Sequence, residues 1–373
     1  MNKELKRNIL IDCHVFDGSF QGTTTYLKGI YLEMIKDNNY QFYFASNNTE
    51  TIKKIFGIQE NVHYLKYNSH NKFYRLLIDI PRLIKQNKID FAHFQYIIPP
   101  IKYCKYINTI HDVLFLDFPQ YFPLSYRLKN KFLFKWSAKK SDIVLTVSSF
   151  SKNQIEKHFK INTIAITPNA VDPVYFEQYD KTAIKYKVKD KYNVDKYWIY
   201  ISRWEPRKNH HTLLEVFVEN KFYKDFSLVF IGDKSINNEK YNLYYLKLSD
   251  EIKSKIITLN KVNFEELVLL LRGANLSVYP SFAEGFGIPP LEALAAKIPS
   301  IFSNTTAMAE YSFSLEYMFD PYNKEDILNS IKTALSKEVD ETKIEVLKSN
   351  YNWAISASIL KAKINTIVAS QTI

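Results

Sequence analysis

The chain has 373 residues, of which 46% are hydrophobic and 15% aromatic. This length and composition exclude a disordered chain and favour two domains. The net charge of +11 lies entirely in residues 1–160, which hold 24 Lys and Arg against 13 Asp and Glu. A one-sided basic surface favours an anionic membrane, an anionic substrate or nucleic acid as its partner. Cys13 and Cys104 form no metal-ligand spacing and no disulfide framework, which is typical of a reducing cytoplasm.

Short apolar runs alternate with amphipathic stretches through the first half of the chain. Because Asp12 interrupts the first run, we interpret that run as a strand and not as a signal peptide. No run approaches the eighteen or so apolar residues of a transmembrane helix. Strand–helix alternation predicts a parallel sheet covered on both faces. Strands are expected at 7–15, 40–46, 89–95, 105–113, 142–148 and 163–171, and helices at 24–36, 71–86 and 148–159.

Residues 125–142 are the densest basic segment, and the pattern favours a helix. One interpretation is an interfacial helix that holds the protein on an anionic membrane, since each basic residue near such a surface contributes about 1 kcal/mol. The other is a core helix with a solvated lysine face. The cations are Arg127, Lys129, Lys131, Lys135, Lys139 and Lys140, and the interleaved apolar residues are Phe132, Leu133, Phe134 and Trp136.

A charged stretch at 173–196 has little apolar periodicity and is interpreted as the connection between domains. A second strand–helix series follows, and a long amphipathic helix is expected at 352–370. The fold class is therefore α/β, with two doubly wound domains and a cleft between them, and ligands are expected at the carboxyl ends of the strands. Strands are expected at 197–202, 226–232, 255–260, 276–281 and 299–303, and helices at 210–220 and 264–274.

The motif "SRWEPRKN" gathers three cations where the first strand of the second domain ends. Pro206, Arg207 and Lys208 are expected to form a turn, and Asn209 to cap the next helix. A guanidinium such as that of Arg203 binds two oxygens at once, and an ammonium adds a point charge, so the cluster suits a phosphate or diphosphate. The alternative is a charged surface turn.

A second motif, "SFAEGFGIPPLEALA", lies farther along the same domain. Gly285 and Gly287 allow the backbone to approach a ligand. Proline at the start suits a first helical turn. Glu284 in the loop and Glu292 about one turn into the helix are expected to face one pocket, where carboxylates accept hydrogen bonds from sugar hydroxyls. Taken singly, Glu292 is equally a helix-dipole acid and Glu284 a plain loop residue.

Together these motifs resemble the signature of retaining glycosyltransferases of family 4, the group 1 transferases, which have the GT-B fold. The Glu-x(7)-Glu spacing of Glu284 and Glu292, the Arg-x(4)-Lys pair of Arg203 and Lys208, and segments such as "ITPNAVDP" occur in the expected order. The resemblance implies an acceptor-binding domain at 1–175 and a nucleotide-sugar-binding domain at 176–352. It also implies a final helix at 353–373 that returns to the first domain.

The resemblance assigns roles to single residues of the donor domain. Arg203 and Lys208 would hold the donor diphosphate and stabilise charge on the leaving nucleotide. Glu292 would bind the ribose hydroxyls. Glu284 would contact the donor sugar near the reacting carbon, with the Gly285–Phe286–Gly287 amides beside it.

Two further residues belong to the acceptor domain. His111, in "TIHD", would approach the donor sugar, whereas without the resemblance it would be interpreted as a satisfied histidine at a strand end. Gly22, in "FQGTTTYLKG", would allow the first loop to approach the diphosphate. The chain departs from the family pattern here, because Thr24 and Thr25 stand where many relatives have glycine and arginine.

The resemblance also implies a mechanism. The departing diphosphate takes up charge and accepts the acceptor's proton, and the anomeric configuration is retained. Because no Asp-x-Asp motif occurs, the Arg–Lys pair is expected to replace a metal, and no metal or other cofactor is expected.

The mannosyl- and hexosyltransferases of bacterial surface polysaccharide assembly, including O-antigen synthesis, are similar in "SRWEPRKN" and "HFQYIIPP", so GDP-mannose is the expected donor. The expected acceptor is a lipid-linked glycan. The expected location is the cytoplasm, peripheral on the anionic inner face of the membrane.

Alternative functions are a glycoside hydrolase, which also uses two carboxylates, and a non-catalytic sugar-binding relative. A hydrolase needs no diphosphate clamp, and the intact glutamate and cation pairs argue against a non-catalytic relative. A nucleic-acid binder is disfavoured because no zinc finger or RNP-type motif occurs and the basic excess lies in one domain. A dinucleotide oxidoreductase is disfavoured because no G-x-G-x-x-G follows the first strand of either domain.

Overall fold

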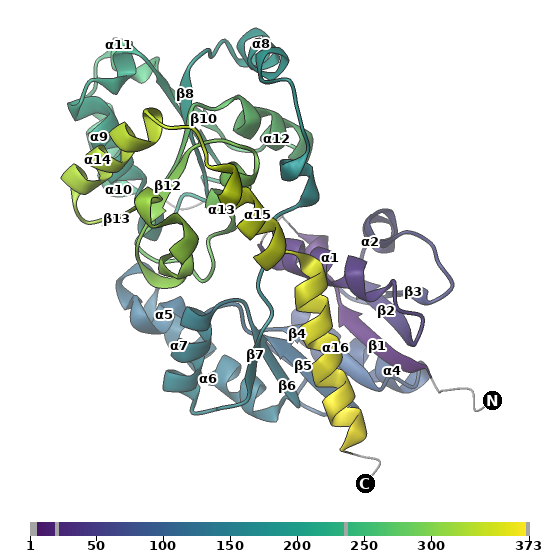
Figure 1. The fold of residues 1–373 in the computed structure, drawn as a ribbon. Coiled ribbons are helices and arrows are strands. Elements are labelled where there is room, and N and C mark those ends of the chain that lie inside the picture. Colours follow the sequence, from purple (N-terminus) through teal and green to yellow (C-terminus); the bar gives the residue numbers. More distant parts are fainter. Residues whose placement is uncertain (1–5, 19–21, 235–237, 371–373) are drawn as a thin grey trace. The chain divides into compact units, whose positions relative to one another are not determined.

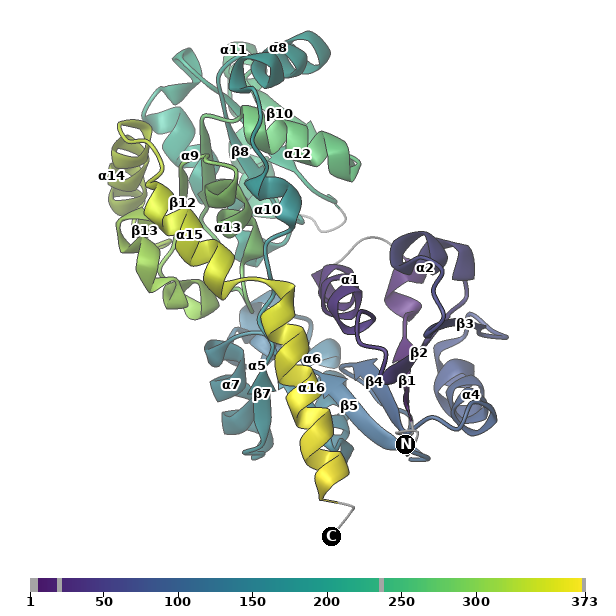
Figure 2. The same ribbon diagram turned by 45° about the vertical axis from the view of Figure 1, so that its right-hand side comes forward.

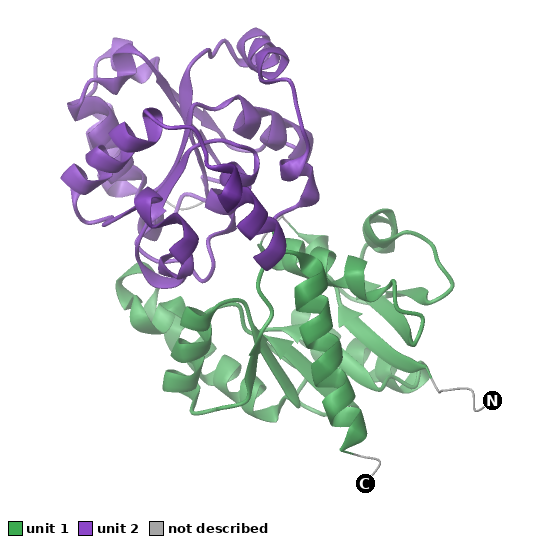
Figure 3. Ribbon diagram, viewed as in Figure 1, with its two compact units in different colours: residues 1–170, 352–373 green, residues 171–351 purple. Residues whose placement is uncertain are grey.

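The computed structural model describes residues 6–18, 22–234 and 238–370. The chain divides into two compact units (Figure 3). Unit 1 comprises residues 1–170 and 352–373, and unit 2 comprises residues 171–351. The first unit thus ends five residues before the boundary expected at residue 175, and the chain returns to it within one residue of the expected position.

In the described part of unit 1, seven parallel strands form one sheet in the order β3-β2-β1-β4-β5-β6-β7 (Figure 1). The central strands are buried on both faces, as every residue of β4 shows, and such strands appear in a sequence as continuous apolar runs. The strands are β1 (Arg7–Asp12), β2 (Tyr40–Ser46), β3 (Val62–Lys66), β4 (Phe91–Gln95), β5 (Lys105–Thr109), β6 (Ile143–Thr146) and β7 (Ile164–Ile166).

The first strand is shorter than the expected range of 7–15, because β1 ends at Asp12 and a 3-10 turn follows at His14–Asp17. The carboxylate of Asp12 is buried there, 3.5 Å from Nε of Arg75 and 2.8 Å from the donating hydroxyl of Tyr67. A buried charge needs such partners, and they fix the chain where the strand stops.

Helices cover both faces of this sheet (Figures 1 and 2). The segment expected as one helix at 71–86 contains a π-helical turn, Arg75–Asp79, between α3 and α4. The helix α2 and the strand β3 were not predicted. The helices of unit 1 are α1 (Gly22–Met34), α2 (Thr49–Phe56), α3 (Lys72–Tyr74), α4 (Ile80–Gln86), α5 (Leu114–Asp117), α6 (Leu124–Lys140), α7 (Ser149–Phe159) and α16 (Trp353–Ala369).

The basic segment forms α6, and this helix has features of both interpretations. Phe134 and Ala138 are buried in the core, whereas Leu128 and Phe132 expose 62% and 70% of their surface. Within the described residues, none of the helices combines the length and the apolar character needed to cross a bilayer.

The described part of unit 2 is built on six parallel strands in the order β10-β9-β8-β11-β12-β13. The expected strands are all present, and β13 was not predicted. The strands are β8 (Tyr197–Ile201), β9 (Ser227–Ile231), β10 (Ile256–Leu259), β11 (Leu276–Tyr279), β12 (Ser300–Ser303) and β13 (Met318–Phe319). In both units the order reverses beside the first strand, which is the doubly wound arrangement.

The stretch 173–196 is not a simple connection, so this expectation was wrong. It contains the helix α8 (Lys181–Tyr192), which belongs to unit 2 and packs on α12. Asp180 caps the helix by accepting from the amides of Thr182 and Ala183, and Val188 is buried. The other helices of unit 2 are α9 (His210–Glu219), α10 (Glu239–Leu246), α11 (Asp250–Lys253), α12 (Phe264–Gly273), α13 (Ile288–Ala295), α14 (Lys324–Leu335) and α15 (Glu341–Asn350).

The last helix, α16, packs against α1 within unit 1 (Figure 2). Gly29 of α1 allows this close approach, because a Cβ atom at this position would lie 2.0 Å from Cε2 of Trp353. The indole therefore occupies the space that any larger residue at position 29 would need.

Replacing Gly29 with alanine is expected to destabilise unit 1. Alanine normally stabilises a helix by about 0.5–1 kcal/mol relative to glycine, but overpacking costs about 1–3 kcal/mol, so a net loss and a lower Tm are expected. Thermal unfolding of Gly29→Ala followed by circular dichroism measures this. Gly18→Ala is the control, because a Cβ at Gly18 meets no atom within 4 Å. Equal melting temperatures for the two variants would contradict the proposed packing.

Candidate active site

The cationic loop of unit 2 follows β8. The chain leaves the strand at Ile201, and Pro206–Lys208 form a single 3-10 turn before α9. Asn209 occupies the capping position of α9, but its backbone is left-handed (φ 58°) and its side chain makes no capping bond, contrary to expectation. The side-chain amide of Asn209 donates instead to the carbonyl of Pro321 at 3.2 Å, so this residue ties the loop to the segment before α14.

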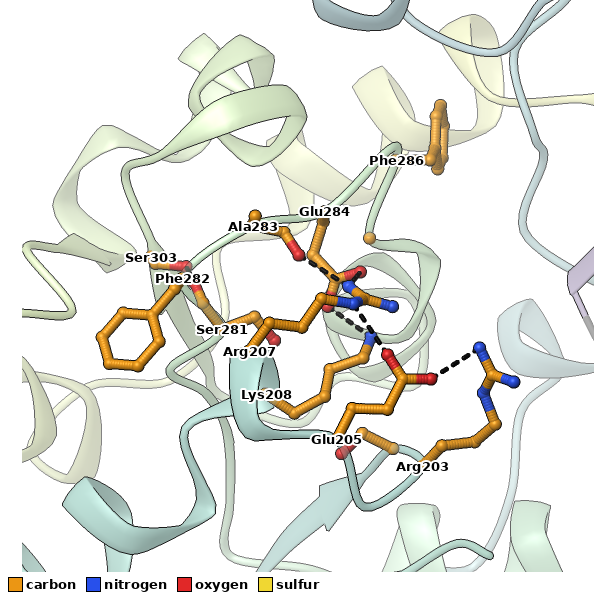
Figure 4. A network of polar contacts seen from close by, with 12 residues as sticks. Arg203, Glu205, Arg207, Lys208, Ser281, Phe282, Ala283, Glu284, Phe286 and Ser303 are labelled. Carbon is orange, nitrogen blue, oxygen red and sulfur yellow. Dashed lines mark hydrogen bonds and ion pairs between the residues drawn. The ribbon is translucent and has the colours of Figure 1, made fainter. Parts of the chain in front are cut away.

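A chain of ion pairs joins this cationic loop to the glutamate loop after β11 (Figure 4). Nζ of Lys208 lies 2.6 Å from Oε1 of Glu284, and Nη1 of Arg207 lies 3.1 Å from Oε2 of the same carboxylate. Arg207 also donates through Nη1 to the carbonyl of Ala283 at 2.6 Å. Glu205 holds Nε of Arg207 at 2.7 Å and Nη2 of Arg203 at 2.7 Å. The structure thus brings Arg203, Lys208 and Glu284 into one network.

The network leaves a net positive charge beside the loop. It contains three cations and two carboxylates, so one positive charge remains for an anionic ligand. Burial alone would raise the pKa of Glu284, but the charges of Lys208 and Arg207 outweigh burial and lower it to about 2. Burial and the charge of Arg207 lower the pKa of Lys208. Arg203, with 56% of its side chain exposed, is the most accessible of the three cations.

The glycine-rich loop is held against its own unit. Gly287 has φ +87° and caps α13, and a Cβ atom there would lie 2.6 Å from Cγ of Met308. Phe286 is buried, and its carbonyl accepts from the hydroxyl of Tyr311 at 2.6 Å. The amide of Glu284 donates to Oγ1 of Thr306 at 2.9 Å. The loop is therefore positioned by contacts on both sides of Gly285, which is itself buried.

Glu292 lies apart from the ion-pair network. It is the fifth residue of α13, and burial, followed by the negative charge of Asp172, raises its pKa to about 8. Hydrogen-bond donors placed beside such a carboxyl group stabilise its charged form and lower its pKa. The expected ribose contact supplies donors of that kind.

The two remaining candidates belong to unit 1. His111 lies two residues beyond β5 and is buried, with Nε2 2.5 Å from Oε1 of Gln95. Gly22 is the first residue of α1 and is exposed, and a Cβ there would meet no atom within 4 Å. Residues 19–21 of the same loop lie outside the described residues.

Sequence reasoning missed Glu205 and Gln95. Glu205 stands between two arginines in "RWEPRK", and a lone acid in a basic motif is a signal that it pairs with them. Gln95 had no comparable signal, because only the pairing of β4 with β5 brings it near His111. Among residues 6–18, 22–234 and 238–370, no group of three or more His, Cys, Asp or Glu side chains is arranged to hold a metal ion.

Comparison with known families identifies the family of this chain. Residues 182–351 match the family described as "Glycosyl transferases group 1", and residues 22–175 match "Glycosyltransferase Family 4". The chain therefore belongs to the group 1, family 4 glycosyltransferases, because the two matches together cover most of its length. The two matched regions meet close to the division between the two units.

Among its relatives is the O-antigen chain mannosyltransferase RfbU of Salmonella typhimurium, which is 30% identical over 60% of this chain and 59% of its own length. Another is the O-antigen chain mannosyltransferase B of Escherichia coli, 27% identical over 66% of each chain. The matches thus span about three fifths to two thirds of these relatives. A glycosyltransferase structure from Rickettsia africae covers 97% of this chain and 99% of its own, with a TM-score of 0.72 and 19% identity. This similarity confirms the GT-B fold.

Glu292 is expected to make the stability of the protein decrease between pH 5 and pH 8. Its carboxyl keeps a proton in the folded state up to about pH 8 but loses it near pH 4.5 when unfolded, so the folded state binds more protons and stability falls as pH rises. Glu292→Gln removes this difference and is expected to raise Tm relative to wild type at pH 8 but not at pH 4.5. Thermal unfolding across this range tests the expectation.

The control is Glu345→Gln, which alters a carboxylate with 71% of its side chain exposed on α15. This variant is expected to follow the wild-type pH dependence. If Glu292→Gln also follows the wild-type pH dependence, the pKa of Glu292 is not raised in the folded protein.

Proposed function

We propose that this protein is a retaining, metal-independent mannosyltransferase that uses GDP-mannose and extends a lipid-linked surface glycan. The observation that carries the proposal is the buried contact of Glu284 with Lys208 and Arg207, joined through Glu205 to Arg203. It places a carboxylate suited to sugar hydroxyls directly beside cations suited to a diphosphate. A glycoside hydrolase needs the carboxylate but has no use for the cations.

In the proposed reaction the network acts on the leaving group. As the glycosidic bond breaks, negative charge develops on the diphosphate, and Arg203 and Lys208 stabilise it. A preorganised donor of this kind lowers the barrier by about 3 kcal/mol. The leaving phosphate then accepts the proton of the attacking hydroxyl, on the same face of the sugar. The cations supply the charge that a divalent metal supplies in other transferases.

Glu284 has a second part in this proposal. Each of its carboxylate oxygens already accepts from one cation, and a carboxylate has about four acceptor positions, so positions remain for donor-sugar hydroxyls. Glu292 binds the ribose, the Gly285–Phe286–Gly287 amides lie beside the sugar, and His111 and Gly22 contribute from unit 1. The choice of mannose rests on the two O-antigen mannosyltransferases, whose names specify that sugar.

Calorimetric titration with GDP, UDP and dTDP in buffer containing EDTA tests the donor site. GDP is expected to bind most tightly without metal. Arg203→Ala and Lys208→Ala are each expected to weaken binding by about 10- to 100-fold, since a hydrogen bond to a charged group contributes ~1.5–3 kcal/mol. Lys324→Ala is the matched control, because Lys324 pairs with Glu215 at 2.8 Å on the surface of unit 2.

Transfer from GDP-mannose, followed by mass spectrometry, completes the test. Glu284→Ala and Lys208→Ala are expected to abolish most transfer. Arg203→Ala is expected to do the same without a loss of folding, because the Arg203 side chain is exposed. Near wild-type transfer in these variants would contradict the site. Activity that requires Mn²⁺ would contradict metal independence, and glycan cleavage without nucleotide would favour the hydrolase.

For its location, we propose that unit 1 binds the anionic inner face of the membrane through α6. Leu124, Leu128 and Phe132 recur at four-residue spacing, so they lie on one side of the helix, and each exposes more than 60% of its surface. Lys129 and Lys131 are exposed on the same turns. Exposed apolar residues combined with lysines are typical of a helix that lies in a membrane interface.

A second exposed apolar group lies on α3 and the π-helical turn. Phe73, Leu77 and Ile78 each expose about half of their surface or more. These elements and α6 rest on one core cluster, which contains Leu76 and has Trp136 packed against it. Burial, the charge of Arg75 and then the charge of Lys129 on α6 lower the pKa of Lys72, so the two basic segments are close. Both groups support binding to the same lipid surface.

Sedimentation with vesicles of phosphatidylglycerol and phosphatidylcholine tests this surface. Wild type is expected to sediment with the vesicles at low salt and to be released as salt screens the charges. Phe132→Glu is expected to reduce binding by 10-fold or more, because it replaces an exposed apolar side chain that would enter the membrane interface with a negative charge. Ile58→Glu, which alters a residue 92% exposed elsewhere on unit 1, is expected to have little effect. Equal loss in both variants, or no binding by wild type, would contradict the proposal.

A further inference from the structure

His111 is held by a side chain from the neighbouring strand. Gln95 is the last residue of β4, which pairs in parallel with β5, and His111 follows β5. The 2.5 Å contact joins Nε2 of His111 to Oε1 of Gln95, and both side chains are buried. Because an amide oxygen only accepts hydrogen bonds, Nε2 of His111 must carry the proton of this bond.

The contact continues into the core as a chain of hydrogen bonds. Nε2 of Gln95 lies 3.4 Å from Nε2 of His93, and Nδ1 of His93 lies 2.7 Å from the hydroxyl of Tyr31. Burial lowers the pKa of His93 and of His111 to about 3, so both rings are neutral at pH 7 and each has one donor and one acceptor nitrogen.

The proton on His111 follows from the orientation of the Gln95 amide and does not depend on the tautomer of His93. With this amide oriented as observed, its oxygen faces Nε2 of His111 and can only accept, so Nε2 donates. Oγ1 of Thr109 lies 2.8 Å from Nε2 of His93 and donates to the hydroxyl of Tyr26 at 3.3 Å. The buried groups behind Gln95 are thus hydrogen-bonded to one another, and the contact with Gln95 sets the proton on His111.

We infer that Gln95 is a positioning residue that holds His111 in the tautomer protonated at Nε2, so that Nδ1 accepts a hydrogen bond from a substrate hydroxyl. This inference rests on the proposed function, in which His111 contacts the donor sugar. The rings of Tyr26 and Tyr96, centred 5.0 and 5.5 Å from the imidazole, restrict its rotation. Sugar hydroxyls donate readily, and a protonated imidazolium has no lone pair with which to accept from them.

A glutamine serves this purpose better than a carboxylate. A glutamate at position 95 would also accept from Nε2, but its negative charge would raise the pKa of His111 and favour the imidazolium. The titratable side chains placed around His111 are Tyr26 from α1, Tyr96 after β4 and, through Gln95, His93. Asp112 is next in the chain, and its carboxylate accepts from the amide of Leu114 at 3.2 Å.

Nitrogen-15 NMR of the imidazole rings tests the tautomer directly, on the full chain without donor. The His111 signals are assigned by their loss in His111→Ala. A protonated Nε2 and an unprotonated Nδ1 from pH 6 to pH 8 are expected. A proton on Nδ1, or an imidazolium in that range, would overturn the inference. Because this measurement needs no transfer reaction, it holds even if the proposed donor is wrong.

Kinetics of Gln95 variants test the role of the tautomer. Gln95→Leu is expected to lower kcat by about 10- to 100-fold with a smaller change in KM, by analogy with the loss of the outer hydrogen-bond partner of a metal-bound histidine. Gln95→Glu is expected to retain more activity at high pH and to lose it as pH falls and His111 gains a proton. Wild type is expected to show no such step.

A matched control exists in the same unit, where Oε1 of Gln41 lies 2.7 Å from Nε2 of His63 on the neighbouring pair of strands β2 and β3. Gln41→Leu removes the same kind of bond from a histidine outside the site and is expected to leave kcat unchanged. Melting temperatures identify any loss of folding. If folded Gln95→Leu matches Gln41→Leu in kcat, or if Gln95→Glu follows the wild-type pH dependence, Gln95 does not position His111.

Discussion

The buried carboxylate of Glu284 is the interaction on which the candidate donor site depends. It joins two loops that are 76 residues apart in the chain, one after β8 and one after β11. Burying a carboxylate without partners is costly, and removing one partner from such a pair costs about 3–5 kcal/mol. The contacts of Lys208 and Arg207 therefore fix both loops at the carboxyl edge of the sheet. The glycine loop, the start of α13 and hence Glu292 all follow from that position.

The surroundings of His111 in unit 1 differ, because the buried polar side chains next to it carry no charge. His93, Thr109 and Gln95 have less than 6% of their surface exposed, so each must find a partner within the protein. A chain of hydrogen bonds satisfies them without any ion. The two units thus hold their candidate residues by different means: ion pairs in unit 2, and hydrogen bonds between neutral groups in unit 1.

Much of the fold could be predicted from the sequence, because buried parallel strands are short apolar runs that stand out between amphipathic helices. Helix α8 could not, since its apolar contacts are few and its stability depends on the Asp180 cap and on packing against α12. The motifs likewise indicated Arg203, Lys208, Glu284 and Glu292. They did not indicate that Arg207 shares the carboxylate of Glu284, because that pairing exists only once β8 and β11 lie side by side.

Glu205 has a consequence for ligand selection. Its carboxylate holds Arg203 at 2.7 Å, so an anion that binds this guanidinium competes with a negative group that is covalently tethered only two residues away. The effective concentration of such a tethered competitor is high, and a singly charged, weakly held anion gains little by replacing it. A diphosphate, which contacts several cations at once, can outcompete it. In the proposed donor site, the acid within the basic motif is therefore expected to favour a diphosphate over a simple phosphate.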